Sequence, residues 1–335
     1  MVKIAIVGAG YIGKLHANIC KEIQNASVVA IVDIVEEKAK NLAFELGAKF
    51  YTDVDMLLGN KDIDVVAVCT PTYTHAEIVK RAANAKKNIF CEKPFALSMK
   101  EADEMVEAVK KNNVKSMAGH VLRFWPEYVK IKEIVESGAL GEPLHAFCER
   151  LCVVPDWAEG KWNVKKNLGG GAALDLQIHD LDYLIYIFGK PSIVESQGVY
   201  DPKLGGWAHM STNIKFKKGQ CGLVNAGWIV KGKFPFTMLV RILCENGAIE
   251  WIFRAGVNIE ERAQQTAITI YKSDGSVYTE KAKQVDPYYL EWEYFIDCLE
   301  NGKDISIATF EDASTSLKLA LASIESAEKM SIVRI

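Results

Sequence analysis

The sequence has no apolar run approaching the roughly twenty residues that a membrane-spanning helix needs. Its apolar start, residues 1–8, is too short for the core of a signal peptide and ends in a glycine turn, not in a cleavage site. Positive charge is not in excess either, because 40 Lys and Arg stand against 43 Asp and Glu, interspersed along the chain. We therefore expect a soluble, cytoplasmic protein that binds neither nucleic acid nor membranes.

Cysteine pairs at the C-x-x-C spacing of metal and redox motifs are also missing, although the chain has eight cysteines. Cys148 and Cys152 lie close together, but their segment is predicted to be a strand and no cluster of His or Cys follows it. These absences predict reduced, structural thiols and no metal site.

Residues 1–120 alternate short apolar runs with amphipathic helical patterns. Continuous apolar strands separated by helices are typical of a parallel sheet that is covered on both faces. The predicted fold class is therefore α/β, with a doubly wound Rossmann domain over residues 1–120. Its predicted strands are residues 3–7, 28–33, 65–69, 88–91 and 115–118, and its predicted helices are residues 13–22, 36–46, 74–85 and 98–111.

The pattern changes after residue 120. Strand-like runs predominate from residue 193 to 280, and Asn246-Gly247 and Asp274-Gly275 are common hairpin turns. Helices are predicted at residues 126–137, in a segment that ends near Phe188, and at residues 287–300 and 311–329. We expect residues 121–335 to form a C-terminal α+β domain with a large, mainly antiparallel open sheet.

Residues 8–13, with the sequence GAGYIG, match the G-x-G-x-x-G fingerprint of dinucleotide-binding domains. The motif follows a predicted strand and opens a helix, so its glycines allow a tight turn, close approach of a pyrophosphate and close helix packing. Asp33 lies twenty residues after Gly13, where a carboxylate hydrogen-bonds the ribose 2′-hydroxyl and repels a 2′-phosphate. NAD is therefore expected in preference to NADP. The predicted cofactor residues of this region are Gly8, Gly10, Tyr11, Ile12, Gly13 and Asp33.

Two further segments follow strands whose carboxyl ends face the same crevice of a doubly wound sheet. Residues 70–75 have the sequence TPTYTH, for which a simple helix cap by Thr74 is the alternative explanation. Residues 91–94, CEKP, place Lys93 at the edge of the crevice. These segments add Thr70, Pro71, His75, Glu92 and Lys93 to the predicted cofactor-binding residues.

Residues 169–180, GGGAALDLQIHD, place Asp175 and His179 four residues apart on one face of a predicted helix. Asp175 could hydrogen-bond one imidazole nitrogen while the other nitrogen faces a substrate hydroxyl. The alternative is a structural role, because a carboxylate near a helix start also interacts favourably with the helix dipole.

These motifs, in their order and approximate spacing, resemble the glucose-fructose oxidoreductase/inositol dehydrogenase (Gfo/Idh/MocA) family over essentially the whole chain. The resemblance implies an N-terminal NAD(P)-binding domain and a C-terminal sheet that carries the substrate site and mediates assembly into a homodimer or homotetramer. It also implies a catalytic group of Lys93, Asp175 and His179, and a cis peptide bond between Lys93 and Pro94.

The function implied by this resemblance is that of an NAD-dependent dehydrogenase acting on a CH–OH group of a sugar, polyol or cyclitol. His179 would take the hydroxyl proton, Asp175 would fix the imidazole tautomer, and Lys93 would donate to the reacting oxygen. Two alternatives share the fold: an NAD-dependent glycosidase that oxidises its sugar transiently, and a non-catalytic NAD-sensing regulator. Net formation of NADH separates the dehydrogenase from both.

The sequence departs from the family pattern at two positions. Many relatives have Trp-Arg where this chain has Trp162 and Asn163, and they have glycine where it has Gln177. The first departure affects a contact with substrate or cofactor, and the second affects the pocket beside His179. Neither departure removes a catalytic group.

Further candidates lie in loops and at the predicted domain junction. Arg123 and the nearby His120 could face the substrate, with an ordinary junction contact as the alternative. Trp157, Trp162 and Trp207 lie in or near loop-like segments where a ring can stack on a sugar. The predicted substrate-binding residues are Lys93, Arg123, Trp162, Asp175 and His179.

Two other histidines are weaker candidates. His209 begins a predicted strand and could reach the substrate, whereas His16 on the first helix is expected to be packed or to lie near the cofactor. Trp228, Trp251 and Trp292 fall in strand or helix patterns and are expected in the core.

Overall fold

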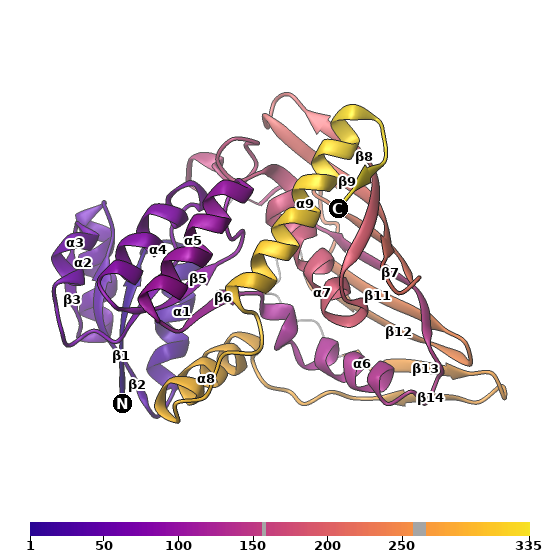
Figure 1. Cartoon of the computed structure of the whole chain (residues 1–335), viewed down its shortest axis with the longest axis horizontal. Coiled ribbons are helices and arrows are strands. Elements are labelled where there is room, and N and C mark those ends of the chain that lie inside the picture. The colour runs from indigo at the N-terminus through magenta and orange to yellow at the C-terminus, as the bar shows by residue number, and fades with distance from the viewer. Residues whose placement is uncertain (156–158, 257–265) are drawn as a thin grey trace. The chain divides into compact units, whose positions relative to one another are not determined.

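The structure is a computed structural model that describes residues 1–155, 159–256 and 266–335. The chain forms two compact units (Figure 1). The first comprises Met1–Phe124 and Val285–Thr315, and the second comprises Trp125–Gln284 and Ser316–Ile335. The expected division placed all of residues 121–335 in one C-terminal domain, whereas the chain returns to the first unit for Val285–Thr315.

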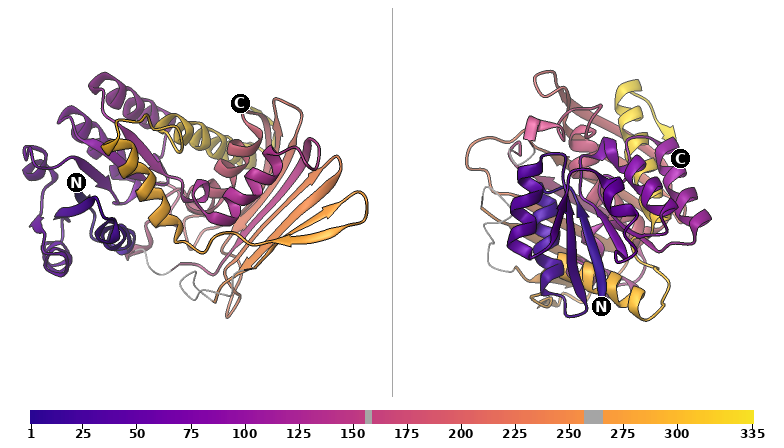
Figure 2. Two further views of the ribbon diagram at one scale, coloured as in Figure 1. Left: turned by 90° about the horizontal axis from the view of Figure 1, so that it is seen from below. Right: turned by 90° about the vertical axis from the view of Figure 1, so that its left-hand side faces the viewer.

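The first unit contains a six-stranded parallel sheet in the order β3-β2-β1-β4-β5-β6, which confirms the Rossmann prediction. Its central strands are almost wholly buried, because α1, α2 and α8 pack against one face while α4 and α5 cover the other (Figure 2). The strands are β1 (Val2–Val7), β2 (Ala26–Val32), β3 (Lys49–Tyr51), β4 (Val65–Val68), β5 (Asn88–Glu92) and β6 (Ser116–Gly119). The helices are α1 (Tyr11–Glu22), α2 (Glu36–Leu46), α3 (Val54–Leu58), α4 (His75–Asn84), α5 (Met99–Asn112) and α8 (Pro287–Glu300).

The return of α8 to the first unit has a clear cause in packing. Trp292, Phe295 and Ile296 are buried and belong to the same apolar core as Ile4 and Phe90 of the sheet. Asp286 caps the start of the helix, because its carboxylate accepts hydrogen bonds from the backbone N–H groups of the first turn. The periodicity of the sequence predicts the helix and its apolar face, but it does not show against which of the two sheets that face packs.

The second unit contains a nine-stranded open sheet in the order β14-β13-β12-β11-β7-β10-β9-β8-β15. Only the β7–β10 pair is parallel among the strands that the structure describes, so the mainly antiparallel prediction is confirmed. Its strands are β7 (Pro143–Leu151), β8 (Pro191–Asp201), β9 (Gly206–Phe216), β10 (Cys221–Gly227), β11 (Thr237–Cys244), β12 (Gly247–Arg254), β13 (Ile268–Lys272), β14 (Val277–Glu280) and β15 (Val333–Arg334).

One face of this sheet is covered and the other is largely open. Helices α6 (Pro126–Glu136) and α7 (Ile178–Phe188) lie on the covered face with the later part of α9 (Phe310–Lys329), as Figure 2 shows. Burial alternates accordingly along β7, where Cys148 and Arg150 are buried while Phe147 and Leu151 are half-buried on the open face. Such alternation is expected of an antiparallel sheet covered on one side.

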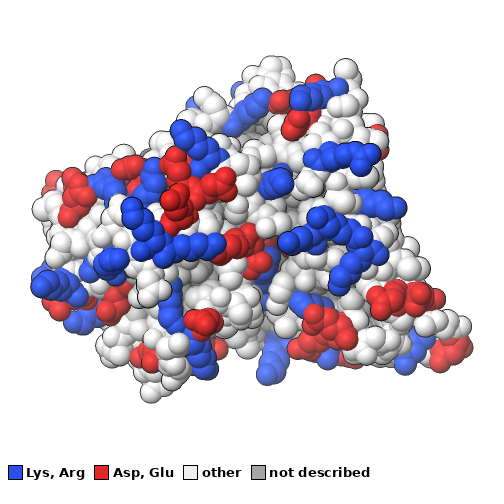
Figure 3. All heavy atoms as spheres, in the orientation of Figure 1, with Lys and Arg blue, Asp and Glu red and all other residues white. Residues whose placement is uncertain are grey.

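Charged side chains of both signs are interspersed on the face shown in Figure 3. In the described part of the chain, every helix is too short or too polar to cross a bilayer. All eight cysteines are free, and seven of them are buried.

A buried ion pair fixes α7 on the sheet of the second unit. Arg150 of β7 donates to both carboxylate oxygens of Asp180, through Nε at 2.8 Å and Nη2 at 3.1 Å. Nη2 also lies 3.2 Å from the hydroxyl of Tyr128 on α6. Because Asp180 follows His179 directly, this pair sets the position of the helix turn that carries the predicted catalytic histidine.

We predict that Arg150→Met destabilises the protein by about 3–5 kcal/mol, because it leaves the Asp180 carboxylate buried and unpaired. Arg150→Met/Asp180→Leu should recover most of this loss, since replacing both partners removes the uncompensated charge. Urea unfolding of the three proteins measures the effect. A double variant as unstable as Arg150→Met would contradict this account of the pair.

Candidate active site

The glycine loop between β1 and α1 is closed by backbone contacts that exclude side chains. Gly8 has φ +101°, and a Cβ there would lie 2.5 Å from the carbonyl oxygen of Cys69. A Cβ at Gly13 would lie 1.8 Å from the carbonyl oxygen of Gly8. At Gly10, by contrast, a Cβ would meet nothing within 4 Å. The loop therefore packs tightly on its inner side and leaves open space on its outer side.

The open side of this loop fits a pyrophosphate. Helix α1 starts after Gly10 without a side-chain cap and without an acidic residue in its first turn. The positive end of the helix dipole at this helix start favours an anion. Tyr11 is 42% exposed and Ile12 is half-buried beside it.

Asp33 lies at the end of β2, next to the glycine loop. One carboxylate oxygen accepts from the N–H of Ala9 at 2.8 Å, and the other accepts from the N–H of Val35 at 2.9 Å. Each carboxylate oxygen has a second acceptor position, so the oriented side chain retains capacity for ribose hydroxyls. This geometry supports the predicted role of Asp33.

Residues 70–75 form a compact loop at the carboxyl end of β4. The hydroxyl of Thr74 donates to the carbonyl of Pro71 at 2.7 Å and lies 2.7 Å from the hydroxyl of Thr70, from which it can accept. His75 is buried, and its Nε2 lies 2.8 Å from the carbonyl of Thr70. Burial lowers the pKa of His75, so a neutral ring with Nε2–H as donor fits this position. His75 therefore supports the loop through this contact, and the predicted cofactor contacts of Thr70, Pro71 and His75 stay predictions.

Glu92 is the last residue of β5 and Lys93 follows it, and the peptide bond between Lys93 and Pro94 is cis, as expected. Glu92 is 5% exposed. Burial works to raise its pKa, but the hydrogen bond from His16 and the charge and backbone N–H of Lys93 act against burial, and the pKa of Glu92 lies below its ordinary value. Glu92 is therefore a buried carboxylate that stays ionised, with Lys93 next to it and less buried.

In the second unit, Asp175 lies in a π-helical turn, η4 (Ala173–Gln177), that leads into α7. The sequence predicted a regular helix, and the wider turn was missed because periodicity cannot show one inserted residue. Asp175 is 6% exposed and accepts a hydrogen bond from Nδ2 of Asn163 at 3.2 Å. His179 is half-buried on the first turn of α7.

The glycines before Asp175 permit close backbone packing around it. A Cβ at Gly169 would lie 2.4 Å from the Cα of Asn163, and a Cβ at Gly171 would lie 3.0 Å from the backbone of Trp207. Gly171 also has φ +66°, which most other residues avoid. The glycine segment therefore holds Asn163 against the carboxylate of Asp175.

The two departures from the family pattern occupy buried positions next to the predicted catalytic pair. Asn163 supplies a neutral donor to Asp175. Gln177 bridges two strands, since its Nε2 donates to the carbonyls of Met210 and Val224 and its Oε1 lies 3.2 Å from the hydroxyl of Thr212. These contacts were not predicted, because they join residues from separate parts of the sequence.

Three other candidates, Arg123, His120 and His209, lie in different surroundings. Arg123 is buried and forms an ion pair with Asp312 at 2.9 Å, within the first unit. His120 is 2% exposed in the same region. His209 lies on the open face of the sheet, because it alternates along β9 with Thr212 and Met210, which contact Gln177 on the covered face. Arg123 thus has an ion-pair partner within its own unit, and its predicted substrate contact stays a prediction.

Trp162 is half-buried in the loop before Asn163, a position compatible with its predicted role. Trp157 lies outside the described residues. Trp207 is 9% exposed, while Trp228, Trp251 and Trp292 are buried as expected.

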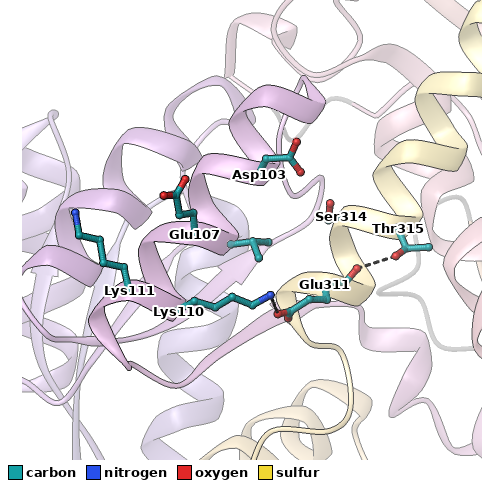
Figure 4. A pocket seen from close by; sticks show the side chains of 8 residues that line it. Asp103, Glu107, Lys110, Lys111, Glu311, Ser314 and Thr315 are labelled. Atoms are coloured by element: carbon teal, nitrogen blue, oxygen red, sulfur yellow. Dashed lines mark hydrogen bonds and ion pairs between the residues drawn. The ribbon is translucent and has the colours of Figure 1, made fainter.

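A groove on the surface of the first unit contains none of these residues. It runs between α5 and the start of α9, where Lys110 pairs with Glu311 at 2.8 Å (Figure 4). Its lining is an open, mixed-charge surface. In the described residues no group of three or more His, Cys, Asp or Glu is arranged to hold a metal ion.

Two family models match successive parts of the chain. The model described as "Oxidoreductase family, NAD-binding Rossmann fold" (GFO_IDH_MocA) covers residues 2–120. The model described as "GFO/IDH/MocA C-terminal domain" covers residues 128–250. Together they span more than half of the chain.

Known proteins resemble the chain over its full length. A myo-inositol 2-dehydrogenase of Thermotoga maritima is 28% identical over 100% of this chain and 98% of its own. A scyllo-inositol 2-dehydrogenase (NAD(+)) of Bacillus subtilis is 29% identical over 97% of this chain and 94% of its own. The solved structure of a levoglucosan dehydrogenase with NADH and levoglucosan superposes with a TM-score of 0.88, at 23% identity, over 100% of this chain and 99% of that one. The last similarity shows the fold.

One buried carboxyl in the first unit was not anticipated. Glu291 on α8 is wholly buried, and its carboxyl oxygens have no hydrogen-bond partner among the described residues. Burial, with a further contribution from the negative charge of Glu92, raises its pKa well above the ordinary value. Glu291 is therefore protonated in the folded state at a pH where an unfolded glutamate is ionised.

This difference predicts a pH-dependent effect of Glu291→Gln on stability. Folding must keep the proton on Glu291, so the wild type loses stability as the pH rises from the unfolded pKa near 4.5 toward the raised folded pKa. A glutamine side chain does not titrate, so the variant does not lose stability in this way. The thermal midpoint of Glu291→Gln minus that of the wild type should therefore increase as the pH rises through this window.

The matched control is Glu293→Gln, because Glu293 is exposed on the same helix. Its thermal midpoint should follow that of the wild type at every pH. A midpoint difference for Glu291→Gln that stays constant with pH would show that Glu291 is not held protonated.

Proposed function

Because the chain belongs to the Gfo/Idh/MocA family of NAD-binding oxidoreductases, we propose that it oxidises a secondary hydroxyl of a sugar, polyol or cyclitol with NAD. The observation that carries the proposal is the full-length similarity to two inositol 2-dehydrogenases. The retained Lys93, Asp175 and His179 support it, because a protein that only sensed NAD would have no need of all three.

The first unit supplies the residues that would hold the cofactor. The N–H groups after Gly10 would bind the pyrophosphate, and Asp33 would bind the adenosine ribose. Thr70, Pro71 and the Glu92–Lys93 segment follow neighbouring strands at the carboxyl edge of the same sheet. When bound, NAD supplies the acceptor for a hydride from the carbinol carbon.

The protein's own residues handle the proton. His179 takes the proton of the substrate hydroxyl, and a base positioned in this way contributes about 10²–10⁴ in rate. Asp175 orients the ring and stabilises the imidazolium that forms. Lys93 donates a hydrogen bond to the substrate oxygen, where negative charge develops as the proton leaves. In the reducing direction each residue reverses its role.

The substrate class follows from the relatives. Both full-length relatives are named for oxidation of an inositol, a ring whose every carbon carries a hydroxyl. Trp162 offers a ring face that can pack on the C–H groups of such a substrate. The eight free thiols fit a reducing compartment such as the cytoplasm.

The open sheet face of the second unit suits assembly into a homodimer or homotetramer. Half-buried apolar side chains lie in adjacent strands of this face, since Leu223 pairs with Phe147 and Leu239 pairs with Ile252. Glu149 and Arg241 lie between these two pairs on the same face, so the face combines apolar and charged groups, as protein–protein interfaces do.

The activity is tested with a panel of inositols, polyols and sugars, followed at 340 nm with NAD and with NADP. We expect net NADH formation with at least one of them, and a preference for NAD of at least about tenfold, equivalent to about 1.4 kcal/mol. His179→Ala should lower kcat by about 10²–10⁴, because the proton then leaves without a positioned base. His209→Ala is the matched control and should retain wild-type kcat.

Three outcomes would contradict this proposal. Hydrolysis without net NADH would indicate an NAD-dependent glycosidase, and binding of NAD without turnover of any compound would indicate a regulator. Near-native turnover by His179→Ala would exclude His179 as the base.

The proposed assembly is tested by substitutions that place a charged side chain on the open face of the sheet. Leu223→Asp and Leu239→Asp should each lower the mass measured by light scattering, because a carboxylate would then be buried without a partner in the interface. Phe44→Asp, at a position that is 89% exposed on α2, is the control and should leave the mass unchanged. A monomeric wild type would disprove the assembly.

A further inference from the structure

A buried hydrogen-bond network ends at the backbone N–H of Lys93, the proposed catalytic lysine. The inference drawn from this network rests on the proposed function of Lys93. The network consists of Trp292, His16, Glu92 and the backbone N–H of Lys93, and we call it the His16 network. Trp292 and His16 are 0% exposed and Glu92 is 5% exposed. These residues come from α8, α1 and the end of β5, all within the first unit.

The direction of every hydrogen bond in this network is fixed by chemistry. The indole Nε1–H of Trp292 can only donate, and it lies 2.8 Å from Nδ1 of His16. Nδ1 must therefore be the acceptor, which leaves the proton of the neutral imidazole on Nε2. That proton points to Oε1 of Glu92, 2.7 Å from Nε2. Trp292 thus selects the tautomer of His16 that suits an ionised Glu92.

The second carboxylate oxygen of Glu92 binds the backbone of the segment that carries Lys93. Oε2 accepts from the backbone N–H of Lys93 at 2.9 Å. The backbone of Gly119 lies close to the other oxygen, because a Cβ there would be only 2.9 Å from Oε1. The donors His16 Nε2–H and Lys93 N–H, one to each carboxylate oxygen, therefore fix Glu92 and the start of the Lys93 segment.

Aromatic rings enclose His16. Phe90 and Tyr288 meet its ring edge-to-face, with centroids 5.0 Å and 5.6 Å away. Phe90 also stacks on Trp292 at 4.5 Å. In such an apolar enclosure a hydrogen bond is stronger than in water, and an unmatched donor or acceptor costs more.

We propose that His16 and Trp292 are positioning residues for Lys93: they hold Glu92 as a double acceptor, so that its second oxygen fixes the backbone of the lysine. Neither side chain needs to touch substrate or cofactor for this role. The proposal gives α8 a function in the first unit beyond covering the sheet.

Glu92→Gln tests the network because a glutamine cannot accept a hydrogen bond from both neighbouring donors. Trp292 keeps His16 in the tautomer that donates, so the ring cannot adjust to the new side chain. The glutamine has one oxygen and one NH₂ group, while both of its neighbours, His16 Nε2–H and Lys93 N–H, are donors. Whichever way the amide turns, its NH₂ group meets another N–H. Trp292→Phe removes the donor that fixes the tautomer, so His16 can then carry its proton on Nδ1 and accept from the introduced NH₂ group through Nε2.

We therefore expect Glu92→Gln to lower kcat by at least about tenfold, equivalent to about 1.4 kcal/mol, and Trp292→Phe to lower it less. Glu92→Gln/Trp292→Phe should be several-fold faster than Glu92→Gln, although it carries one more substitution. The matched control is Glu92→Gln/Phe295→Leu, because Phe295 lies in the same core without a polar atom. This control should not recover activity.

A second measurement needs no substrate. The ¹H–¹⁵N spectrum of ¹⁵N-histidine protein, with His16 assigned by His16→Gln, reports which ring nitrogen is protonated. We expect the proton on Nε2 in the wild type and on Nδ1 in Glu92→Gln/Trp292→Phe.

The two measurements separate the network from the proposed activity. Nε2 protonation without turnover of any sugar would count against the activity and leave the tautomer assignment standing. A wild-type His16 protonated on Nδ1 would overturn the network. A double variant no faster than Glu92→Gln would overturn its role in positioning Lys93.

Discussion

Buried carboxylates impose the constraint on which both units depend. A carboxylate removed from water keeps its charge only where the protein supplies donors. Glu92 receives His16 Nε2–H and the N–H of Lys93 in the first unit. In the second unit Asp175 receives the amide of Asn163, and Asp180 receives the guanidinium of Arg150. Each carboxylate adjoins or is itself a proposed catalytic residue, so the groups that stabilise its charge also fix that residue in place.

Those features that depend on local sequence could be predicted. The glycine fingerprint requires a strand before it and a helix after it, and the structure has β1 and α1 at these places. The helix predicted over residues 98–111 is α5, and its start is fixed locally, because the Ser98 hydroxyl accepts from the N–H of Glu101 while the Glu101 carboxylate accepts from Leu97 N–H and from the Ser98 hydroxyl. Apolar runs and hairpin turns were sufficient to predict both sheets, since continuous and alternating patterns distinguish buried from half-covered strands.

Features that depend on distant residues could not be predicted. Trp292 was expected only to be core, yet it binds a histidine 276 positions away. Arg123 was expected either at the substrate or in a junction contact, and its ion-pair partner Asp312, on a helix near the other end of the chain, could not be foreseen from either. The short strand β3 and the π-helical turn η4 leave too little periodicity to detect. The roles of Lys93, Asp175 and His179 remain proposals that rest on family resemblance together with the local geometry of each unit.

Direct transfer of hydrogen from the substrate's carbinol carbon to NAD is the central claim, and isotope labelling tests it most directly. A substrate from the panel, deuterated at the oxidised carbon, is turned over in ordinary water and the NADH formed is analysed by mass spectrometry and NMR. The account predicts one deuterium on C4 of the nicotinamide, with a slower turnover than for the unlabelled substrate. NADH without deuterium, or loss of the label to water, would contradict hydride transfer.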